Sequence, residues 1–318
     1  MSFSYSRPLA DIDNSYHFLN NVLSLDDNWL TSVDTRFKDI ASLALDIMAT
    51  EKMIVLMEED STIVSQKYRV PNYKNDTQRR ELRTQIFEEL ISLERLDNDD
   101  SIALGVGGAK PRNGVNSEKK AFFVTGLPAS GKSSIVSKIA DSYGAYVVDS
   151  DFSKRKLPEF NINFGANLVH QESQLVTLGS KDAVHENEYN LYEYCISKGH
   201  NIIIPKIGYD HKSIEKMRDT LTDKYGYEVH LTLVSLDRVK STLRALGRYL
   251  TTDRYVPLTL IFDSYANDPI LSYYRTKHCD KWASYGKVSS DVKLGEPPEF
   301  LEGEKDNPSM LFETGEKS

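Results

Sequence analysis

The sequence predicts an α/β fold in which a parallel sheet is flanked by helices and preceded by a helical extension. From residue 118 onward, short apolar segments alternate with helical segments, the order that builds a parallel sheet with helices on both faces. Before that point, apolar residues recur at helical spacing. The length of 318 residues fits about two domains. We therefore expect a helical N-terminal region with its linker over residues 1–117, the α/β domain over 118–290 and a polar C-terminal tail over 291–318.

Two helices are expected in the N-terminal region. One is capped by Asp34 and runs towards Glu58, and the other runs from Asp76 to about Leu96. The following segment, residues 97–117, contains NDD, GVGG and KPRNG sequences. These sequences favour turns and are typical of a linker.

Four strands are expected in the α/β domain, at residues 120–125, 145–148, 201–204 and 228–235. Helices are expected at about 131–143, 172–198 and 214–225, and a further helix after the fourth strand carries Arg238, Arg244 and Arg248. From about Gly303 the chain is polar, so we expect its end to be loose.

Composition restricts the class of protein. The chain has 39 Lys and Arg against 47 Asp and Glu, a net charge of −8, which argues against a surface that coats nucleic acid. Its two cysteines, Cys195 and Cys279, are too few for a disulfide scaffold and fit a reducing compartment as buried thiols. No secretory signal and no apolar segment of about 18 residues is visible. We expect a soluble protein of the cytoplasm.

The strongest motif directly follows the first expected strand. It matches G-x-x-x-x-G-K-[ST] at every fixed position and consists of Gly126, Leu127, Pro128, Ala129, Ser130, Gly131, Lys132 and Ser133, with Ser134 next in the helix. In such a phosphate loop (P-loop), backbone N–H groups and the start of the following helix surround phosphates. Lys132 reaches the β- and γ-phosphates, and the Ser133 hydroxyl binds Mg²⁺. The motif therefore predicts a site for ATP and Mg²⁺.

Two acidic residues, Asp149 and Asp151, follow the second expected strand, at the edge where open α/β sheets bind ligands. Carboxylates beside a P-loop can hold Mg²⁺ or accept the proton of an attacking hydroxyl. Asp149 is the better candidate for the metal, and Asp151, which lies beyond the strand end, for the base. Helix capping by Asp151 is a compatible alternative. The basic run 154–156 either attracts an anionic substrate or forms a solvated charged surface.

Together, these residues resemble the zeta toxin family of kinases. The resemblance rests on the P-loop, on Asp149-Ser150-Asp151, on Lys154 with the run Leu157-Pro158-Glu159-Phe160, and on residues 247–257, which look like the arginine-bearing lid of the family. It covers about residues 118–275, roughly half of the chain. The P-loop alone is common to many nucleotide-binding proteins, whereas its combination with D-x-D-x-x-K-x-x-L-P-x-F is much more specific.

The resemblance implies a small-molecule kinase. Characterised members use ATP to phosphorylate the 3′-hydroxyl of the sugar in UDP-N-acetylglucosamine, which blocks the supply of cell-wall precursors. Carried over to this chain, Lys132 binds the phosphates, Ser133 binds Mg²⁺ and Asp151 is the catalytic base.

The resemblance also assigns lid arginines. Arg248 and Arg254 would neutralise charge on the transferring phosphoryl group, a role that suits planar guanidinium groups. The alternative is that they form surface salt bridges. Arg244, one helical turn before Arg248, is a reserve candidate.

The acceptor pocket is less clearly marked. The resemblance places in it Lys154, His170, Glu172 and Ser173, although Glu172 or Ser173 can equally begin a helix. At one point the chain departs from the family: several members carry an acidic residue after the third strand, where this chain has Pro205 and Lys206. A cation there favours an acceptor that carries a phosphate or carboxylate near Lys206, and it weakens the assignment to a UDP-sugar more than the assignment as a kinase.

Other functions stay open. The acceptor could be another metabolite, including a dinucleotide such as NAD, or an RNA 5′-end, against which the acidic charge argues. A regulatory module that binds ATP without transferring phosphate is a further alternative. The N-terminal region is either a built-in inhibitor or a scaffold that docks partners, since zeta-type kinases are commonly blocked by helices of an antitoxin.

Overall fold

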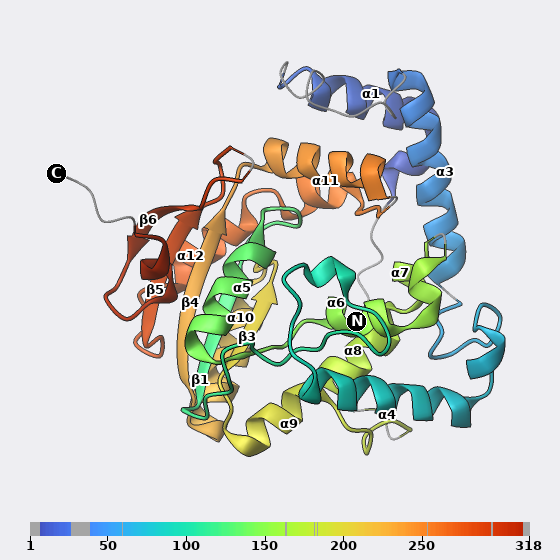
Figure 1. Ribbon diagram of the computed structural model, residues 1–318. Coiled ribbons are helices and arrows are strands. Elements are labelled where there is room, and N and C mark those ends of the chain that lie inside the picture. Colours follow the sequence, from blue (N-terminus) through green and yellow to red (C-terminus); the bar gives the residue numbers. More distant parts are fainter. Residues whose placement is uncertain are drawn as a thin grey trace.

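The computed structural model describes residues 7–26, 39–58, 60–162, 164–180, 182, 184–252, 254–293 and 295–313. Its strands are β1 Lys120–Thr125, β2 Tyr146–Val147, β3 Ile202–Lys206, β4 Glu228–Ser235, β5 Ser284–Ser289 and β6 Glu299–Gly303. Within the described residues these strands form one six-stranded sheet in the order β2-β3-β1-β4-β5-β6 (Figure 1). The first five strands are parallel and β6 runs antiparallel to β5. The predicted α/β fold is confirmed.

The central strands are apolar because both of their faces are covered. Residues 121–125 of β1 and 202–204 of β3 are buried throughout, as expected for parallel strands with helices on each side. Thr125 at the end of β1 lies in register with Lys206 at the end of β3. The P-loop, the residues after β2 and Lys206 therefore meet at one edge of the sheet.

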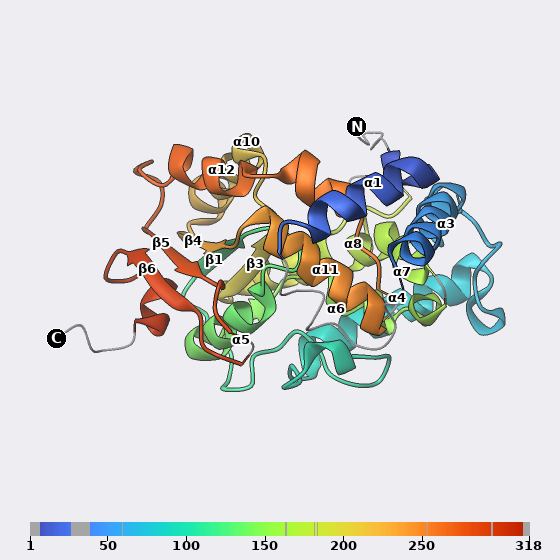
Figure 2. The same ribbon diagram turned by 90° about the horizontal axis from the view of Figure 1, so that it is seen from above.

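The helices of this domain have the following bounds: α5 Lys132–Tyr143, α6 Ser150–Lys156, α7 Gly165–Leu168, α8 His170–Leu178, α9 Leu191–Lys198, α10 His211–Asp219, α11 Arg238–Thr252 and α12 Asp268–Thr276. The shorter turns are η4 Pro158–Asn161, η5 Thr220–Lys224, η6 Leu260–Tyr265 and η7 Pro308–Phe312. Figure 2 shows α5 on one face of the sheet and α10 and α12 on the other. These layers enclose the main core, which includes Phe122, Ile203 and Leu231.

The N-terminal region contributes η1 Pro8–Ala10, α1 Ile12–Leu23, α3 Ile40–Glu58, η2 Pro71–Tyr73, α4 Asp76–Ser92 and η3 Asp99–Ser101. Figures 1 and 2 both show α1 beside α11. Apolar side chains of η1, α1 and α3 join a second core with Leu127 of the P-loop and Leu243, Leu246 and Leu250 of α11. Hydrophobic burial therefore ties the N-terminal helices to the P-loop and to α11.

Several expected helix boundaries differ from the structure. Asp34, the expected cap of the first helix, lies outside the described residues, and the helix is described from Ile40. The second helix begins after Asn75, whose side chain accepts a hydrogen bond from the backbone N–H of Gln78 in a capping box. The single helix expected over residues 172–198 is wrong: α8 ends before Gly179, whose φ of 79° does not continue a helix, and α9 begins twelve residues later at Leu191.

The C-terminal part was expected to be loose from about Gly303, and this expectation is also wrong. β5 and β6 extend the sheet, and η7 packs against them. Asn307 is buried and donates to the carbonyl oxygen of Leu231 and to the hydroxyl of Ser284, at 3.1 Å each. Phe312 joins the main core. The polar residues of this segment satisfy buried sheet groups, which a hydropathy pattern does not reveal.

The two cysteines were both expected to be buried, and the structure buries one of them. Cys195 is buried, and burial raises the pKa of its thiol, whereas Cys279 is half-buried. Among the described helices, none is both long and apolar enough to cross a membrane.

Candidate active site

The loop between β1 and α5 has the tight backbone that its glycines permit. Gly126 and Gly131 have φ angles of 154° and 78°, and Ala129 has a φ of 58°. A Cβ atom on Gly126 would lie 2.6 Å from the carbonyl oxygen of Val234 on β4, so a larger residue requires the sheet to move. The loop leads directly into α5, whose first residue is Lys132. This strand–loop–helix arrangement is the one that binds phosphate groups.

Lys132 lies inside the loop. Its ammonium donates hydrogen bonds to the carbonyl oxygens of Gly126 at 2.7 Å and Leu127 at 2.5 Å. Burial lowers the pKa of Lys132 to about 8, against the opposing effect of Asp149 and Asp151. A phosphate group in the loop would favour the charged form of this lysine.

The two aspartates after β2 have different surroundings. Asp149 is the N-cap of α6, because its carboxylate accepts from the backbone N–H of Asp151 at 2.9 Å. The cap is thus Asp149 and not Asp151. Burial raises the pKa of Asp149, and the neighbouring Asp151 charge raises it further.

Asp151 is held in its ionised form. Its carboxylate lies 3.0 Å from the ammonium of Lys154. Burial acts to raise the pKa of Asp151, but the Lys154 and Arg155 cations outweigh it and lower the pKa below its usual range. At neutral pH the carboxylate is therefore free of a proton, as a base must be.

Helix α11 crosses the P-loop. The hydroxyl of Ser241 on α11 donates to the carbonyl oxygen of Pro128 at 2.5 Å. Arg244 donates to the carbonyl oxygen of Ser290 at 2.9 Å, and its Nη1 lies 4.0 Å from the position of a Cβ on Gly131. Arg244, the reserve candidate, is thus the arginine of α11 beside the P-loop.

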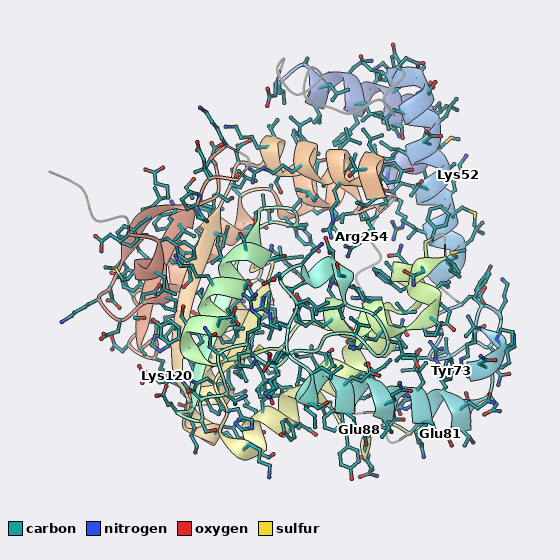
Figure 3. The ribbon with its side chains drawn as sticks, viewed as in Figure 1. Lys52, Tyr73, Glu81, Glu88, Lys120 and Arg254 are labelled. Atoms are coloured by element: carbon teal, nitrogen blue, oxygen red, sulfur yellow. The ribbon has the colours of Figure 1, made fainter. Side chains whose placement is uncertain are left out.

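Three other arginines converge on one carboxylate. We call Arg155, Arg248 and Arg254 the arginine cluster. Their guanidinium groups lie 2.5, 3.3 and 2.6 Å from the Oδ1 atom of Asp100, on the segment after α4. Figure 3 shows Arg254 below α11, on the side that faces α6. Burial lowers the pKa of Arg254, and the charges of Arg248 and Arg155 lower it further, so the cluster holds crowded positive charge.

A cleft of about 680 Å³ joins these groups. It is lined by P-loop residues that include Lys132 and Ser133, by Asp149 and Asp151, by Arg155, Arg244 and Arg248, and by Asp99 and Asp100. The structure thus brings together the predicted P-loop, both predicted aspartates and the lid arginines. Arg248 and Arg254 form salt bridges in this structure, and their partner is the partly exposed carboxylate of Asp100, which lines the cleft.

Sequence reasoning missed Arg155 and Asp100 as site residues. Arg155 lay within the basic run 154–156, but the three side chains of that run have three different environments. Lys154 pairs with Asp151, whereas Lys156 is buried and pairs with Glu89 on α4 at 2.7 Å. Only the helical turn of α6 decides which of them faces the cleft. Asp100 lies in the expected linker, and no sequence signal marked it.

The structure contradicts the expectation that Glu172 binds the acceptor. Its side chain is fully buried, and its carboxylate accepts hydrogen bonds from Arg79 and Arg83 of α4 and from the hydroxyl of Thr62. Burial acts to raise the pKa of Glu172, but Arg79 and its other partners lower it below the usual value. Glu172 supports the site from the protein interior, since its oxygens are already occupied by protein donors.

The structure also contradicts the expectation that Ser173 binds the acceptor. It is fully buried, and its hydroxyl donates to the carbonyl oxygen of His170 at 2.7 Å, one turn earlier. His170 itself interacts electrostatically with the base region: desolvation and the Lys154 cation lower the pKa of His170, and Asp151 acts in the opposite direction. Of the expected acceptor residues on α8, His170 alone lies within electrostatic range of Asp151 among the described groups.

Lys206 lies at the end of β3 with its ammonium largely buried. Burial lowers the pKa of Lys206, while the neighbouring Asp149 carboxylate raises it. Lys206 therefore lies close enough to Asp149 for their charges to interact.

The residues present fit a magnesium ion that is bound together with a nucleotide. Ser133 and Asp149 offer oxygen ligands on the wall of the cleft, and oxygen is the ligand that Mg²⁺ prefers. Among the described residues, no group of three or more His, Cys, Asp or Glu side chains could hold a metal ion. A site completed by phosphate oxygens and water is what a nucleotide kinase uses for Mg²⁺.

The fold and the cleft define a P-loop protein of the kinase type, with a phosphate loop, paired acidic residues at the sheet edge and arginines above them. The model of the zeta toxin family matches residues 107–268, about half of the chain. The protein therefore belongs to the zeta toxin family, a family of P-loop kinases.

Solved structures add information on the fold. A chain of the PezAT chromosomal toxin–antitoxin system of Streptococcus pneumoniae superposes with a TM-score of 0.50 at 12% identity, over 75% of this chain and 87% of that chain. A gluconokinase from Sinorhizobium meliloti 1021 has a TM-score of 0.31 at 11% identity, over 56% of this chain and 86% of that chain. The AvrRxo1-ORF1:-ORF2 complex has a TM-score of 0.39 at 17% identity, over 83% of this chain and 71% of that chain. No curated protein sequence matches this chain.

Proposed function

We propose that the protein is an ATP-dependent kinase that transfers the γ-phosphoryl group to a hydroxyl of a nucleotide sugar such as UDP-N-acetylglucosamine. One observation carries the proposal: the ionised carboxylate of Asp151 lines the same cleft as the P-loop, Arg244 and Arg248. A module that only binds nucleotide has no need of a base at that place.

The residues of the cleft have separate roles in this proposal. The P-loop and Lys132 bind the phosphates, and Arg244, Arg248 and Arg254 offset the charge that spreads over the phosphoryl oxygens during transfer. Mg²⁺, held by Ser133 and Asp149, would supply further charge neutralisation between the phosphates. Asp151 orients the acceptor hydroxyl and takes its proton.

On the acceptor side we assign Lys154, His170 and Lys206. Lys154 keeps Asp151 ionised through the contact at 3.0 Å, and His170 lies within electrostatic range of both. Lys206 is a largely buried cation, and a buried cation favours an anionic group on its ligand. An acceptor with a phosphate or carboxylate, such as another nucleotide or a dinucleotide like NAD, is therefore the second candidate.

Phosphorus NMR tests the proposal. The full chain is incubated with Mg-ATP and UDP-N-acetylglucosamine, other UDP-sugars, NAD or short RNA. Lys132→Ala and Asp151→Asn proteins run alongside, and Asp182→Asn, outside the cleft lining, is the control. We expect a new phosphomonoester signal with one acceptor in wild type and control. Asp151→Asn should lose turnover and keep ATP affinity. Retained turnover in Asp151→Asn refutes the role of the base. Transfer to none of these acceptors, with ATP still bound, refutes the assignment to a nucleotide-sugar or NAD acceptor and favours a module that only binds nucleotide.

A protein partner is a further part of the proposal. One structural relative is named for a toxin–antitoxin system. By analogy with it, we propose that an antitoxin controls this kinase, or that the N-terminal region does so within the chain. Glu51 of α3 accepts a hydrogen bond at 2.6 Å from the hydroxyl of Tyr255, next to Arg254, so the N-terminal helices contact the lid.

A further inference from the structure

The segment between α4 and β1 places an anion where the arginines would meet phosphate. Asp100 lies on η3, and its Oδ1 atom is within 3.3 Å of all three guanidinium groups of the arginine cluster. Burial acts to raise the pKa of Asp100, but Arg254 and Arg155 outweigh it and lower the pKa. The carboxylate is therefore charged, and the guanidinium groups of three arginines contact the same oxygen atom of it.

We propose that Arg155, Arg248 and Arg254 together bind the terminal phosphates of the nucleotide, and that Asp100 occupies this site as an internal competitor until the nucleotide displaces it. The inference rests on the proposed function. It adds Arg155 as a third phosphate-binding arginine, and it assigns Asp100 a role in limiting nucleotide affinity.

The shape of the cleft supports this assignment. Lys132 and Ser133 of the P-loop line the same cleft as Arg155, Arg248 and Asp100, so a nucleotide held by the P-loop extends its phosphates towards the cluster. A phosphoryl group has three oxygens to offer three guanidinium groups, whereas Asp100 offers all of them the same atom. Among the described residues, the buried Nε atom of Arg155 has no hydrogen-bond partner. The cluster therefore has binding capacity that Asp100 does not use.

The carboxylate of Asp100 can leave without unfolding the domain. Its side chain is 51% exposed, so it can turn into solvent. The segment that carries it is anchored by Ile102, which is buried in the main core. Competition by Asp100 is thus a local exchange of one carboxylate for a phosphate group.

The test measures binding and not transfer. Affinities for a non-hydrolysable ATP analogue, AMP and inorganic tripolyphosphate are measured by calorimetry for wild type, Asp100→Asn and Arg155→Gln. Asp97→Asn is the matched control: it removes the same charge from the same segment, its side chain is 95% exposed, and its partner is Arg112.

We expect Asp100→Asn to bind the ATP analogue and tripolyphosphate about three- to tenfold more tightly, as for removal of a competing, partly exposed ion pair. Affinity for AMP should not change, since AMP does not reach the cluster, and the gain should shrink at high salt. Arg155→Gln should lose about tenfold for the ATP analogue, and it should abolish most of the gain when combined with Asp100→Asn.

Other outcomes overturn the inference. If Asp100→Asn binds the ATP analogue no more tightly than Asp97→Asn does, Asp100 is not a competitor. If it binds more weakly, Asp100 positions the arginines instead. Thermal melting of each variant checks the fold, and if Arg155→Gln unfolds, Asp100→Asn alone decides. If the wild-type protein transfers no phosphoryl group but the binding results are as expected, the proposed function is refuted, whereas the competition between Asp100 and the nucleotide is supported.

Discussion

Replacement of Arg79 by methionine should destabilise the protein strongly, because Arg79 is the centre of a buried ionic network. Its guanidinium is 0% exposed and donates to the carboxylates of Glu159 and Glu172 at 2.7–2.9 Å. Glu159 belongs to the Leu157–Phe160 run that marks the family, and Glu172 lies on α8. One arginine of the N-terminal region therefore pairs with two buried carboxylates of the α/β domain.

The magnitude follows from what the substitution leaves behind. Methionine fills similar space but leaves Glu159 without a cationic partner among the described residues, and it leaves Glu172 with Arg83 and the hydroxyl of Thr62. Breaking a buried ion pair by removal of one partner costs about 3–5 kcal/mol of unfolding free energy. For a chain of 318 residues, that lowers the melting temperature by about 4–8 °C.

The assay is urea or thermal unfolding followed by circular dichroism, with Arg80→Met as the control on the same helix. Arg80 is 62% exposed and lies 3.6 Å from Glu188, so its loss should cost less than about 1 kcal/mol. Adding Glu159→Gln to Arg79→Met should recover part of the loss, since it removes the charge whose cationic partner was Arg79. Equal melting temperatures for Arg79→Met and Arg80→Met would refute the reasoning.

Three further predictions test other parts of the structure. Gly126→Ala should abolish ATP binding in calorimetry, because the added Cβ would lie 2.6 Å from the carbonyl oxygen of Val234. The control Gly247→Ala on α11 should leave ATP binding unchanged, because no heavy atom lies within 4 Å of its added Cβ. Equal effects of the two substitutions would contradict the loop geometry. Acid should weaken the buried ionic network around Arg79. Because the folded pKa of Glu172 is below its unfolded value, its contribution is present above about pH 4.5 and is lost as the pH falls through the folded pKa. Urea unfolding between pH 7 and 3 should therefore show the stability gap between wild type and Arg79→Met narrowing towards acid, and a gap independent of pH would exclude this titration. Asn307→Ala should lower the free energy of unfolding by about 1–3 kcal/mol in the same assay, because the buried amide donates hydrogen bonds to the carbonyl oxygen of Leu231 and the hydroxyl of Ser284. An unchanged free energy of unfolding would mean that η7 is not part of the folded core.

The N-terminal region deserves a different test from simple deletion. Removal of residues 1–110 also removes Arg79 and Arg83, and it exposes the apolar side chains of α11 that pack on α1 and α3. Loss of activity after such a deletion would report unfolding as readily as loss of a scaffold. Point changes at Asp100 separate inhibition from folding because they leave both cores in place.

Much of the kinase domain was predictable from local sequence. The bounds of β1 and β4 were predictable from short strand-forming segments at residues 120–125 and 228–235. β1 is buried on both faces through an apolar run, whereas β4 also buries the polar residues His230 and Thr232. The position of Asp149 and Asp151 on the wall of the cleft was predictable as well, because the carboxyl end of a parallel strand lies at the edge where open α/β sheets bind ligands. β5 and β6 were missed, because β5 alternates small and polar residues and is buried by its neighbours.

The P-loop is determined by the sequence itself. Its glycines, lysine and serine act through backbone conformation and through residues a few positions apart, so their spacing carries the information. The arginine cluster with Asp100, and the pairing of Arg79 with Glu159 and Glu172, were decided by the tertiary structure alone. Asp100 and Arg254 are far apart in the chain, and so are Arg79 and Glu172. Whether such a charge is solvated, paired or buried depends on which segments the two hydrophobic cores bring together.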